Sequence, residues 1–355
     1  MRTCYLNHDL KNTTGAGRFG LALVGEMEKI LPQAEITVLT LEASGNRLEA
    51  PVIRAGFFGF LVSVLRVRTI LKTSDIVHAL DGWPYGVLAA LANTGLKKKL
   101  IITAVGSGAV APLYNWRRFL TKWAYRKADV LTAISRNTKK EILKVAPDLT
   151  IKVINHGVDF QKFQVSSSKI QITRFKPYIL SIGTLKKRKG YEHSIRAFAK
   201  ISEKFPGLKY VIVGQGPEKE NIKYQISNLK LEERVIFLEN LSEEELINLY
   251  HNAELFILLP QEINKDMEGF GLVFLEAAAC GLPVVATRNS SAEDAVLDRE
   301  NGILVEGQDA AAAAEAMIKI LSDSSLKESM SKESVAFAQK MSWRKTALAY
   351  AELYK

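Results

Sequence analysis

The sequence has few cysteines and no long apolar run, and each scarcity excludes a class of protein. Cys4 and Cys280 are its two cysteines. They are far apart and flanked by apolar residues, so we expect small core residues in a reducing cytoplasm rather than a disulfide framework or a metal site. No run approaches the about 18 apolar residues of a membrane span, and the start, MRTCYLNHDL, lacks a signal-peptide stretch. We therefore expect a soluble cytoplasmic protein.

The closest candidate for a membrane segment is FFGFLVSVL, residues 57–65, and it is followed by Arg66, Arg68 and Lys72. Two interpretations fit it. One is a basic amphipathic helix that lies in a membrane interface. The other, which we favour, is a buried helix packed on a sheet.

Acidic residues are scarce in the first half of the chain. The 355 residues carry a formal net charge of +10, and residues 1–170 hold 24 Lys and Arg against 12 Asp and Glu. No nucleic-acid motif accompanies these charges, so nucleic acid is not an expected partner. An anionic membrane surface or a lipid-phosphate acceptor would be attracted to such a half, which predicts peripheral association with the inner membrane face. Ordinary solvated helix faces are the alternative.

Short β-rich runs alternate with helix-length segments throughout. The first half contains TCYL, EITVLT, DIVHAL, LIITAV, DVLTAI and KVIN, and after SSSK, residues 166–169, the rhythm restarts with PYILSIG, KYVIVG, RVIFLE, ELFILLP and PVVAT. These runs are continuously apolar, as parallel strands covered on both faces require. The sequence therefore predicts two doubly wound parallel-sheet α/β domains joined near residues 165–175.

The stretch TTGAGRFG, residues 13–20, has the spacing G-x-G-x-x-G at Gly15, Gly17 and Gly20. A dinucleotide fingerprint needs its first glycine directly after a strand and an acid about 20 positions later. Here the polar residues 8–14 intervene, and Glu42 lies later than usual. An NAD-dependent enzyme is therefore the weaker interpretation of this loop.

The most informative region is LLPQEINKDMEGFGLVFLEAAACGLPVVAT, residues 258–287. A helix that starts near Gly271 presents unpaired N–H groups and is a ready anion site. Glu268 precedes this helix and Glu276 lies inside it; eight helical steps would separate them by about 12 Å, beyond the roughly 5 to 9.5 Å of a glycosidase pair. Separated carboxylates can instead each hold one end of a nucleotide sugar.

Five motifs together make the chain resemble the retaining glycosyltransferases of family 4. They are EGFGLVFLEAAACGLPVVAT, SIGTLKKRKG, VIVGQGP, VINHGVDFQKF and AISRNTKKEI. The resemblance covers nearly the whole chain and implies the GT-B fold, two facing Rossmann-like domains with a terminal helix that crosses back onto the first. It implies an acceptor-side domain over residues 1–168 plus 342–355, and a domain over 169–341 that binds the nucleotide-sugar donor.

The resemblance also implies roles for individual residues. Glu268 and Lys189 would be catalytic, Glu268 accepting hydrogen bonds from donor-sugar hydroxyls and Lys189 binding the diphosphate. Glu276 would accept hydrogen bonds from the ribose hydroxyls, and a buried glutamate there needs a partner; the alternative is an ion pair within its own helix. The other implied donor-binding residues are Gly269, Phe270, Gly271, Gly183, Thr184, Gly15, Gly17 and Arg18. The implied acceptor-side residues are Gly106, Ser107, His78 and Asp81, with a buried histidine beside a capping aspartate as the alternative for the last two.

Three positions depart from the family pattern. Thr184 stands where the family usually has arginine, and Val105 where many relatives have a histidine near the acceptor. His156 replaces an asparagine, and we assign it no catalytic role. Because the leaving phosphate is often argued to take the acceptor's proton in these enzymes, the missing histidine is compatible with activity.

The sequence thus predicts a retaining hexosyltransferase that uses a UDP- or GDP-sugar and needs neither metal nor cofactor. The expected acceptor is a hydroxyl of a glycan, a lipid-linked molecule or a small molecule. The departures at Thr184 and Val105 leave a catalytically silent nucleotide-sugar-binding protein as the first alternative, ahead of the NAD-dependent enzyme.

Overall fold

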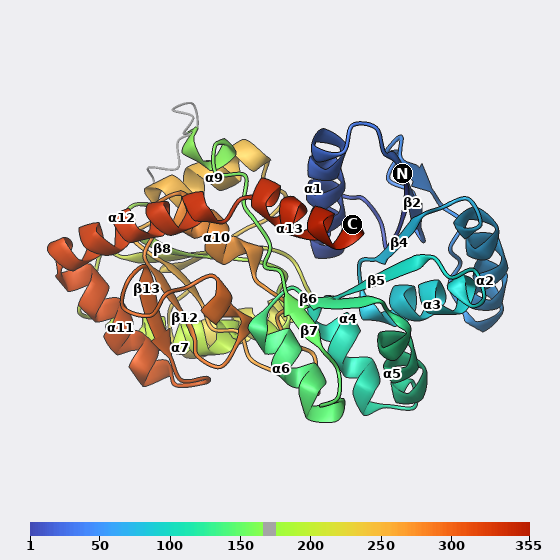
Figure 1. The fold of residues 1–355 in the computed structure, drawn as a ribbon. Coiled ribbons are helices and arrows are strands. Elements are labelled where there is room, and N and C mark those ends of the chain that lie inside the picture. The colour runs from blue at the N-terminus through green and yellow to red at the C-terminus, as the bar shows by residue number, and fades with distance from the viewer. Residues whose placement is uncertain (166–174) are drawn as a thin grey trace. The chain divides into compact units, whose positions relative to one another are not determined.

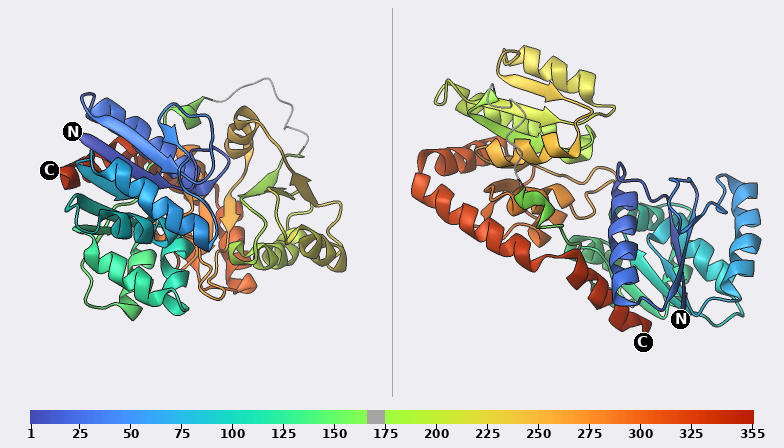
Figure 2. Two further views of the ribbon diagram at one scale, coloured as in Figure 1. Left: turned by 90° about the vertical axis from the view of Figure 1, so that its right-hand side faces the viewer. Right: turned by 90° about the horizontal axis from the view of Figure 1, so that it is seen from above.

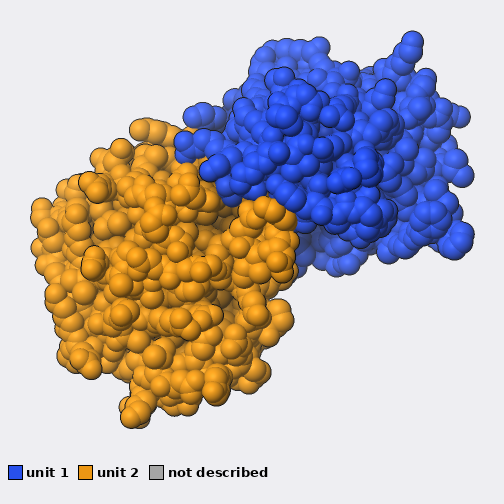
Figure 3. Space-filling view, turned by 90° about the horizontal axis from the view of Figure 1, so that it is seen from below, with its two compact units in different colours: residues 1–156, 343–355 blue, residues 157–342 orange. Residues whose placement is uncertain are grey.

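The computed structural model describes residues 1–165 and 175–355, which form two compact units. The first unit comprises Met1–His156 and Trp343–Lys355, and the second comprises Gly157–Ser342 (Figure 3). Of the predicted junction at residues 165–175, residues 166–174 lie outside the described residues. Among the helices of the described ranges, none combines the length and apolarity that a membrane span requires.

The first unit is built on a seven-stranded parallel sheet with the order β3-β2-β1-β4-β5-β6-β7 (Figure 1). Its strands are β1 (Arg2–Asn7), β2 (Glu35–Thr40), β3 (Glu49–Ala50), β4 (Ile76–Ala79), β5 (Lys99–Ala104), β6 (Val130–Ala133) and β7 (Ile151–Val153). In the register of the central strands, Tyr5 of β1 lies between Val38 of β2 and His78 of β4. The central strands β1, β4 and β5 are buried apart from the first residue of β1 and of β5, as their apolar sequences predict.

Helices cover both faces of this sheet (Figures 1 and 2). They are α1 (Gly15–Ile30), α2 (Phe57–Leu71), α3 (Val87–Asn93), α4 (Gly106–Val110), α5 (Arg118–Lys127), α6 (Arg136–Val145) and α13 (Trp343–Tyr354), with the short turns η1 (Gly82–Gly86) and η2 (Ala111–Tyr114). α1 packs against α13, whereas α3 packs against both α2 and α5. The terminal helix thus belongs to the first unit, and this expectation is confirmed.

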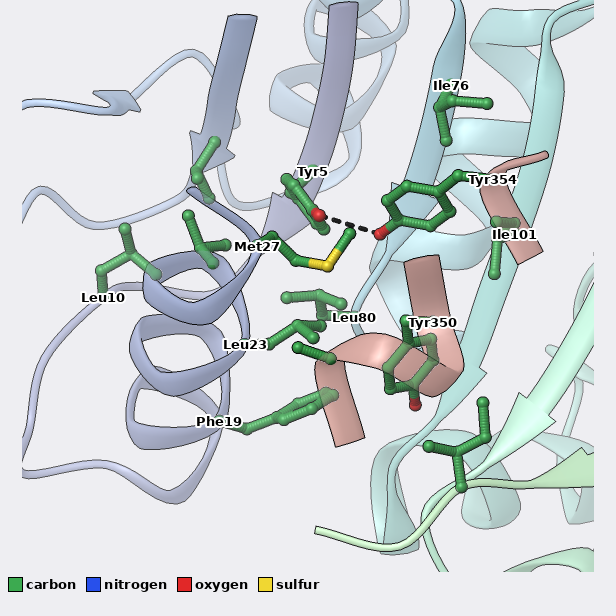
Figure 4. Packing of buried hydrophobic residues seen from close by; sticks show 14 residues of the cluster. Tyr5, Leu10, Phe19, Leu23, Met27, Ile76, Leu80, Ile101, Tyr350 and Tyr354 are labelled. Carbon is green, nitrogen blue, oxygen red and sulfur yellow. Dashed lines mark hydrogen bonds between the residues drawn. The ribbon is translucent and has the colours of Figure 1, made fainter. Parts of the chain in front are cut away.

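The core of the first unit is anchored by aromatic side chains of α1 and α13 (Figure 4). Phe19 of α1 and Tyr350 and Tyr354 of α13 are buried, and the Tyr354 hydroxyl donates a hydrogen bond of 2.8 Å to the Tyr5 hydroxyl of β1. A helix from the end of the chain therefore completes a core that its beginning cannot close alone.

The apolar segment at residues 57–65 differs from the favoured expectation. It forms the first part of α2, whose buried residues include Ser63, Val67 and Leu71. Phe58 is nevertheless 80% exposed, and Phe57, Leu61, Val62 and Leu65 are exposed as well. The prediction of a buried helix packed on a sheet was therefore wrong for this apolar stretch, because apolar residues occur on both faces of α2 and only one face packs on the unit.

The second unit contains a six-stranded parallel sheet with the order β10-β9-β8-β11-β12-β13 (Figure 1). Its strands are β8 (Tyr178–Ile182), β9 (Lys209–Val213), β10 (Val235–Leu238), β11 (Phe256–Leu258), β12 (Val284–Thr287) and β13 (Gly302–Val305). Its main helices are α7 (Tyr191–Ser202), α8 (Lys219–Asn228), α9 (Glu243–Asn252), α10 (Leu272–Ala279), α11 (Ala310–Ser322) and α12 (Ser324–Lys340). Both units are thus doubly wound parallel α/β structures, and the predicted fold class is confirmed.

Candidate functional site

Glycine turns gather at the carboxyl-terminal edge of the second sheet. Gly183 follows β8 and Gly214 follows β9, both with φ of +149°. A Cβ atom at Gly214 would lie 2.1 Å from the carbonyl oxygen of Gly183. The two loops therefore press together in a way that only glycine permits.

The loop after β8 carries two basic side chains to the loop after β11. A short 3₁₀ turn, η5 (Lys187–Lys189), ends at Gly190, where a Cβ atom would lie 1.8 Å from the Leu259 carbonyl oxygen. The Gln261 N–H group also donates a 2.8 Å hydrogen bond to the Arg188 carbonyl oxygen. This close backbone contact explains how residues about 80 positions apart meet at one site.

At this site two cations converge on one carboxylate. Glu268 Oε2 lies 2.8 Å from Lys189 Nζ and 2.6 Å from Arg188 Nη1. Arg188 also forms an ion pair of 3.1 Å with Asp266. The two residues predicted to be catalytic, Glu268 and Lys189, are therefore in direct contact.

The charge state of Glu268 follows from this pairing. Burial by itself raises the pKa of Glu268, but the charges and hydrogen bonds of Lys189 and Arg188 outweigh burial and hold this pKa below its usual value. At neutral pH the side chain is a carboxylate, which accepts hydrogen bonds from hydroxyl groups.

Glu276 is buried in α10 and is held by a neighbouring helix. The Tyr250 hydroxyl of α9 donates a hydrogen bond of 2.9 Å to Glu276 Oε2. The prediction that this carboxylate needs a partner is confirmed, and the partner shown here comes from another helix rather than from α10. Because the helix begins at Leu272 after Gly271 with φ of +80°, the eight-step helical spacing assumed for Glu268 and Glu276 does not apply.

The turn between these two glutamates presents backbone rather than side chains. Phe270 is buried, and a Cβ atom at Gly271 would lie 2.6 Å from the ring of Phe274. The first N–H groups of a helix lack the usual partner four residues earlier, and at this start the Phe274 N–H group donates to the Gly271 carbonyl oxygen. This geometry is compatible with the role that the resemblance implies for Gly269, Phe270 and Gly271, in which their backbone amides bind the donor.

The loop after β8 also contains Thr184, one of the departures from the family pattern. Thr184 is exposed in the loop after β8, whereas Arg188 of the same loop lies in the cluster with Glu268. A cavity of about 420 Å³ opens beside this loop, and its lining includes Lys186, Lys187 and Gln261. Sequence reasoning missed this cavity, and it missed Asp266 as the partner of Arg188 and Tyr250 as the partner of Glu276. No local pattern reveals contacts between residues so far apart in the chain.

In the first unit, the glycine-rich loop has its own structural explanation. β1 ends at Asn7 and α1 begins at Gly15, so the first glycine does not follow the strand directly and the NAD fingerprint is not met. A Cβ atom at Gly17 would lie 2.2 Å from Asp9 Oδ1 and from the Lys11 carbonyl oxygen, whereas one at Gly15 would meet nothing within 4 Å. Gly17 is therefore required by packing within the loop, and Gly15 leaves open space. Arg18 lies in the first turn of α1, half-buried.

Asp81 lies against the predicted acceptor-side turn. It follows β4 and accepts a 2.7 Å hydrogen bond from the Gly82 N–H group, and a Cβ atom at Gly108 would lie 2.0 Å from its Oδ2. Burial raises the pKa of Asp81 to about 8, although the N–H groups of Gly82 and Val105 act in the opposite direction. Gly106 and Ser107 begin α4, directly before Gly108, so the structure brings this part of the predicted set together.

His78 is in the core and is removed from the acceptor-side set. It is completely buried in β4, with its ring nitrogens 2.7 Å from the Tyr354 hydroxyl and 2.7 Å from Thr103 Oγ1. Burial lowers the pKa of His78 to about 3, so the ring is neutral at pH 7. The alternative of a buried histidine describes His78, whereas Asp81, which accepts from the Gly82 N–H group, stays a predicted acceptor-side residue.

A polar cluster that sequence reasoning missed lies at the ends of β1 and β2. Ligand-type atoms of His8, Asp9 and Glu42 lie within 4.8 Å of one another, and Lys11 forms an ion pair of 2.5 Å with Glu42. The His8 ring is also 2.8 Å from the Tyr85 hydroxyl. The signal available in the sequence was that these residues directly follow strands of a parallel sheet, where ligands of open sheets bind.

Two Rossmann-like units, each built on a doubly wound parallel sheet, define the GT-B fold. The same architecture is found in the crystal structure of Anabaena HepE in complex with UDP and glucose, with a TM-score of 0.82, 22% sequence identity, and coverage of 99% of this chain and 98% of that chain.

The chain belongs to glycosyltransferase family 4. Residues 14–162 match the family model described as Glycosyltransferase Family 4, and residues 163–336 match the model described as Glycosyl transferases group 1. It is 30% identical to a D-inositol 3-phosphate glycosyltransferase of Corynebacterium urealyticum over 87% of this chain and 77% of that protein. It is 28% identical to a GDP-mannose-dependent alpha-(1-6)-phosphatidylinositol monomannoside mannosyltransferase of Mycolicibacterium smegmatis over 73% of this chain and 70% of that protein. The protein is therefore a glycosyltransferase.

Proposed function

We propose that this glycosyltransferase moves a hexose from a UDP- or GDP-sugar to an acceptor hydroxyl with retention of anomeric configuration. The observation that carries the proposal is the carboxylate of Glu268, held ionised between Lys189 and Arg188 at the carboxyl edge of the second sheet. The named relatives support the donor class, because one is GDP-mannose-dependent and one solved structure holds UDP and glucose.

The second unit supplies the groups that a nucleotide-diphosphate sugar needs. Glu268 accepts hydrogen bonds from donor-sugar hydroxyls, while Lys189 and Arg188 provide charge for the diphosphate. Glu276, oriented by Tyr250, accepts hydrogen bonds from the ribose hydroxyls. Because the diphosphate charge is met by side-chain cations and by the N–H groups before α10, the proposed reaction uses no metal.

The proposed chemistry needs no base from the protein. The acceptor oxygen forms a bond to the anomeric carbon while the bond from that carbon to the β-phosphate oxygen breaks. The leaving phosphate takes the acceptor's proton on the same face of the sugar. The cations at Lys189 and Arg188 stabilise the charge that develops on this leaving group.

The acceptor is proposed to be a hydroxyl of a glycan or of a lipid-linked molecule, bound at the strand ends of the first unit. Two features could contact an acceptor there: the turn with Gly106 and Ser107, and the carboxyl group of Asp81. The open space at Gly15 leaves room for it. A small-molecule acceptor is the third possibility. The relative named for a phosphatidylinositol mannoside supports a lipid-linked acceptor, and the relative named for inositol 3-phosphate supports a small-molecule one.

Donor binding by variants tests the site. We expect Glu276→Ala and Lys189→Ala each to abolish binding of UDP-glucose and GDP-mannose in isothermal titration calorimetry, because each removes a buried group that holds the donor. The matched controls are Glu333→Ala and Lys204→Ala, which change exposed residues of the same unit and leave binding unchanged.

If Glu276→Ala and Lys189→Ala both bind the donor about as well as the unaltered protein, the proposed donor site is wrong. Binding without transfer or release of nucleotide, across acceptors, would instead identify a catalytically silent nucleotide-sugar-binding protein. Such an outcome would fit the residue differences at Thr184 and Val105.

A further inference from the structure

The first unit exposes large apolar side chains in two neighbouring segments. In α2 the stripe at residues 57, 58, 61, 62 and 65 is exposed, and in the segment from η2 into α5 Trp116 is 73% exposed. The other exposed apolar residues of that second segment are Tyr114, Phe119 and Leu120. We call these side chains together the α2–α5 apolar surface. Contiguous apolar surface of this kind marks an interaction site in soluble proteins.

Ring contacts join the two segments into one surface. Phe60 of α2 stacks on Trp83 with ring centroids 6.2 Å apart and an interplanar angle of 9°. Trp83 in turn packs edge-on against Trp116, also at 6.2 Å. The guanidinium of Arg117 lies over both tryptophans, at 5.0 and 5.3 Å from their ring centroids.

The sequence that contributes this surface is strongly basic. Residues 51–128 contain twelve Lys and Arg but only two acidic residues, Asp75 and Asp81, and no glutamate. Arg66 and Lys72 in α2, and Arg118 before Phe119 in α5, are exposed beside the apolar side chains. Arg118 lies 4.6 Å from the Phe119 ring centroid. Aromatic and aliphatic side chains among exposed arginine and lysine are the combination that binds an anionic membrane interface.

We propose that the α2–α5 apolar surface docks the first unit onto an anionic lipid bilayer. The apolar side chains enter the boundary between headgroups and acyl chains, and the flanking cations contact lipid phosphates. A second copy of this chain is the less suitable occupant, because two such basic surfaces would repel each other and residues 51–128 offer few carboxylates to compensate. The proposal concerns the first unit only and does not depend on the donor proposed for the second.

Sedimentation with vesicles tests this docking on the full chain. We expect binding to vesicles of phosphatidylcholine mixed with phosphatidylglycerol, weakening as salt is raised, and little binding to phosphatidylcholine alone. The double variant Phe58→Ser, Leu65→Ser should lower binding at least fivefold. Its control is Tyr224→Ser, which removes an exposed aromatic side chain from α8 of the second unit and leaves vesicle binding unchanged.

A charge variant keeps the test valid if the apolar variant does not fold. Arg66→Glu with Arg118→Glu should also abolish binding to the anionic vesicles, whereas Lys200→Glu with Lys204→Glu, at exposed positions of the second unit, makes the same charge change without this loss. In addition, Trp116 fluorescence should be quenched by brominated lipid, and the quenching should fall in Trp116→Phe.

Several outcomes would overturn the proposal. They are equal vesicle binding by the site and control variants, no binding to anionic vesicles, or a dimer in sedimentation velocity that Phe58→Ser, Leu65→Ser converts to a monomer. The last outcome would assign the surface to a second copy of the chain. Nucleotide-sugar binding measured on the same variants separates this result from a failure of the proposed function.

Discussion

At the scale of single residues, Tyr250 connects a buried helix to the proposed ribose-binding carboxylate. Its hydroxyl is the donor to Glu276 Oε2, and the tyrosine is completely buried. A buried carboxylate needs such a hydrogen bond, and the bond also determines which way the carboxylate points. Tyr250 is thus expected to act as a positioning residue.

We predict that Tyr250→Phe lowers donor affinity about five- to tenfold, the effect of about 1 to 1.4 kcal/mol for one hydrogen bond. Calorimetric titration of the donor measures this change. The control is Tyr178→Phe, which removes a buried hydroxyl that donates to the Leu249 carbonyl oxygen in the same unit. Equal donor affinity in the two variants, with similar losses of thermal stability, would reduce Tyr250 to a purely structural role.

Arg188 determines the charge state of Glu268 together with Lys189. Because these cations hold the pKa of Glu268 low, donor binding that needs the carboxylate should persist as pH falls toward the usual range of a glutamate. We predict that Arg188→Met raises this pKa and moves the loss of donor binding at acid pH to a higher pH. Donor affinity measured between pH 4 and 8 checks this prediction.

The exposed neighbour Lys187 supplies the control for that pH profile. Lys187→Met removes one cation of the same loop without breaking a contact to Glu268. If the pH at which donor binding is lost rises equally in both variants, the cause is a general effect of net charge. That result would contradict the specific role of Arg188.

At the scale of elements, α13 closes the first unit through a buried polar network and a ring cluster. Tyr354 and Tyr350 reach His78 and Thr103 in the sheet. His156 stacks on Phe19 of α1, with centroids 4.4 Å apart, and lies 5.3 Å from Trp343 of α13. Burial, and for His156 also the charge of Arg18, lowers the pKa of both His78 and His156 to about 3.

These two histidines predict acid sensitivity of the first unit. Each histidine has a lower pKa in the folded state than the value near 6.5 of the unfolded state, so the unfolded state takes up a proton first as pH falls. The free energy of unfolding therefore decreases as pH falls from about 6.5 toward 3. Each contributes a slope of up to about 1.4 kcal/mol per pH unit. We predict that the free energy of unfolding, measured with urea at several pH values, changes less steeply with pH in His156→Phe. This variant keeps the ring stacking.

The same substitution at His193, a partly buried histidine of the second unit, is the control for His156→Phe. An unchanged slope in His156→Phe would mean that this histidine already carries a proton in the folded protein near pH 6.

At the scale of the whole molecule, the donor should act as a folding ligand. A ligand that binds only the folded state at 100 times its Kd stabilises by about 2.7 kcal/mol, which corresponds to an increase in Tm of about 5 to 10 °C for domains of this size. We predict this increase for one class of nucleotide sugar in a thermal-shift panel of UDP-, GDP- and ADP-sugars, and its loss in Glu276→Ala. A panel in which no nucleotide sugar raises Tm would contradict the proposed donor class.

Much of the fold and part of the candidate site could be predicted from local patterns. Continuous apolar runs such as YILSI at residues 178–182 predict strands covered on both faces, and β8 is buried at every position. The need for a partner at Glu276 followed from an acidic residue within an apolar helix. The identity of that partner, Tyr250, did not, because the tyrosine lies on another helix.

Composition and spacing therefore determined that this chain forms two parallel α/β units with charged and glycine-rich strand ends. Only the tertiary structure decided that Arg188 joins Lys189 at Glu268, that His78 is inside the core, and that one apolar face of α2 is left exposed. The physical reason is that periodicity and turn chemistry act over a few residues. Burial and ion pairing instead depend on which distant segments the fold places against them.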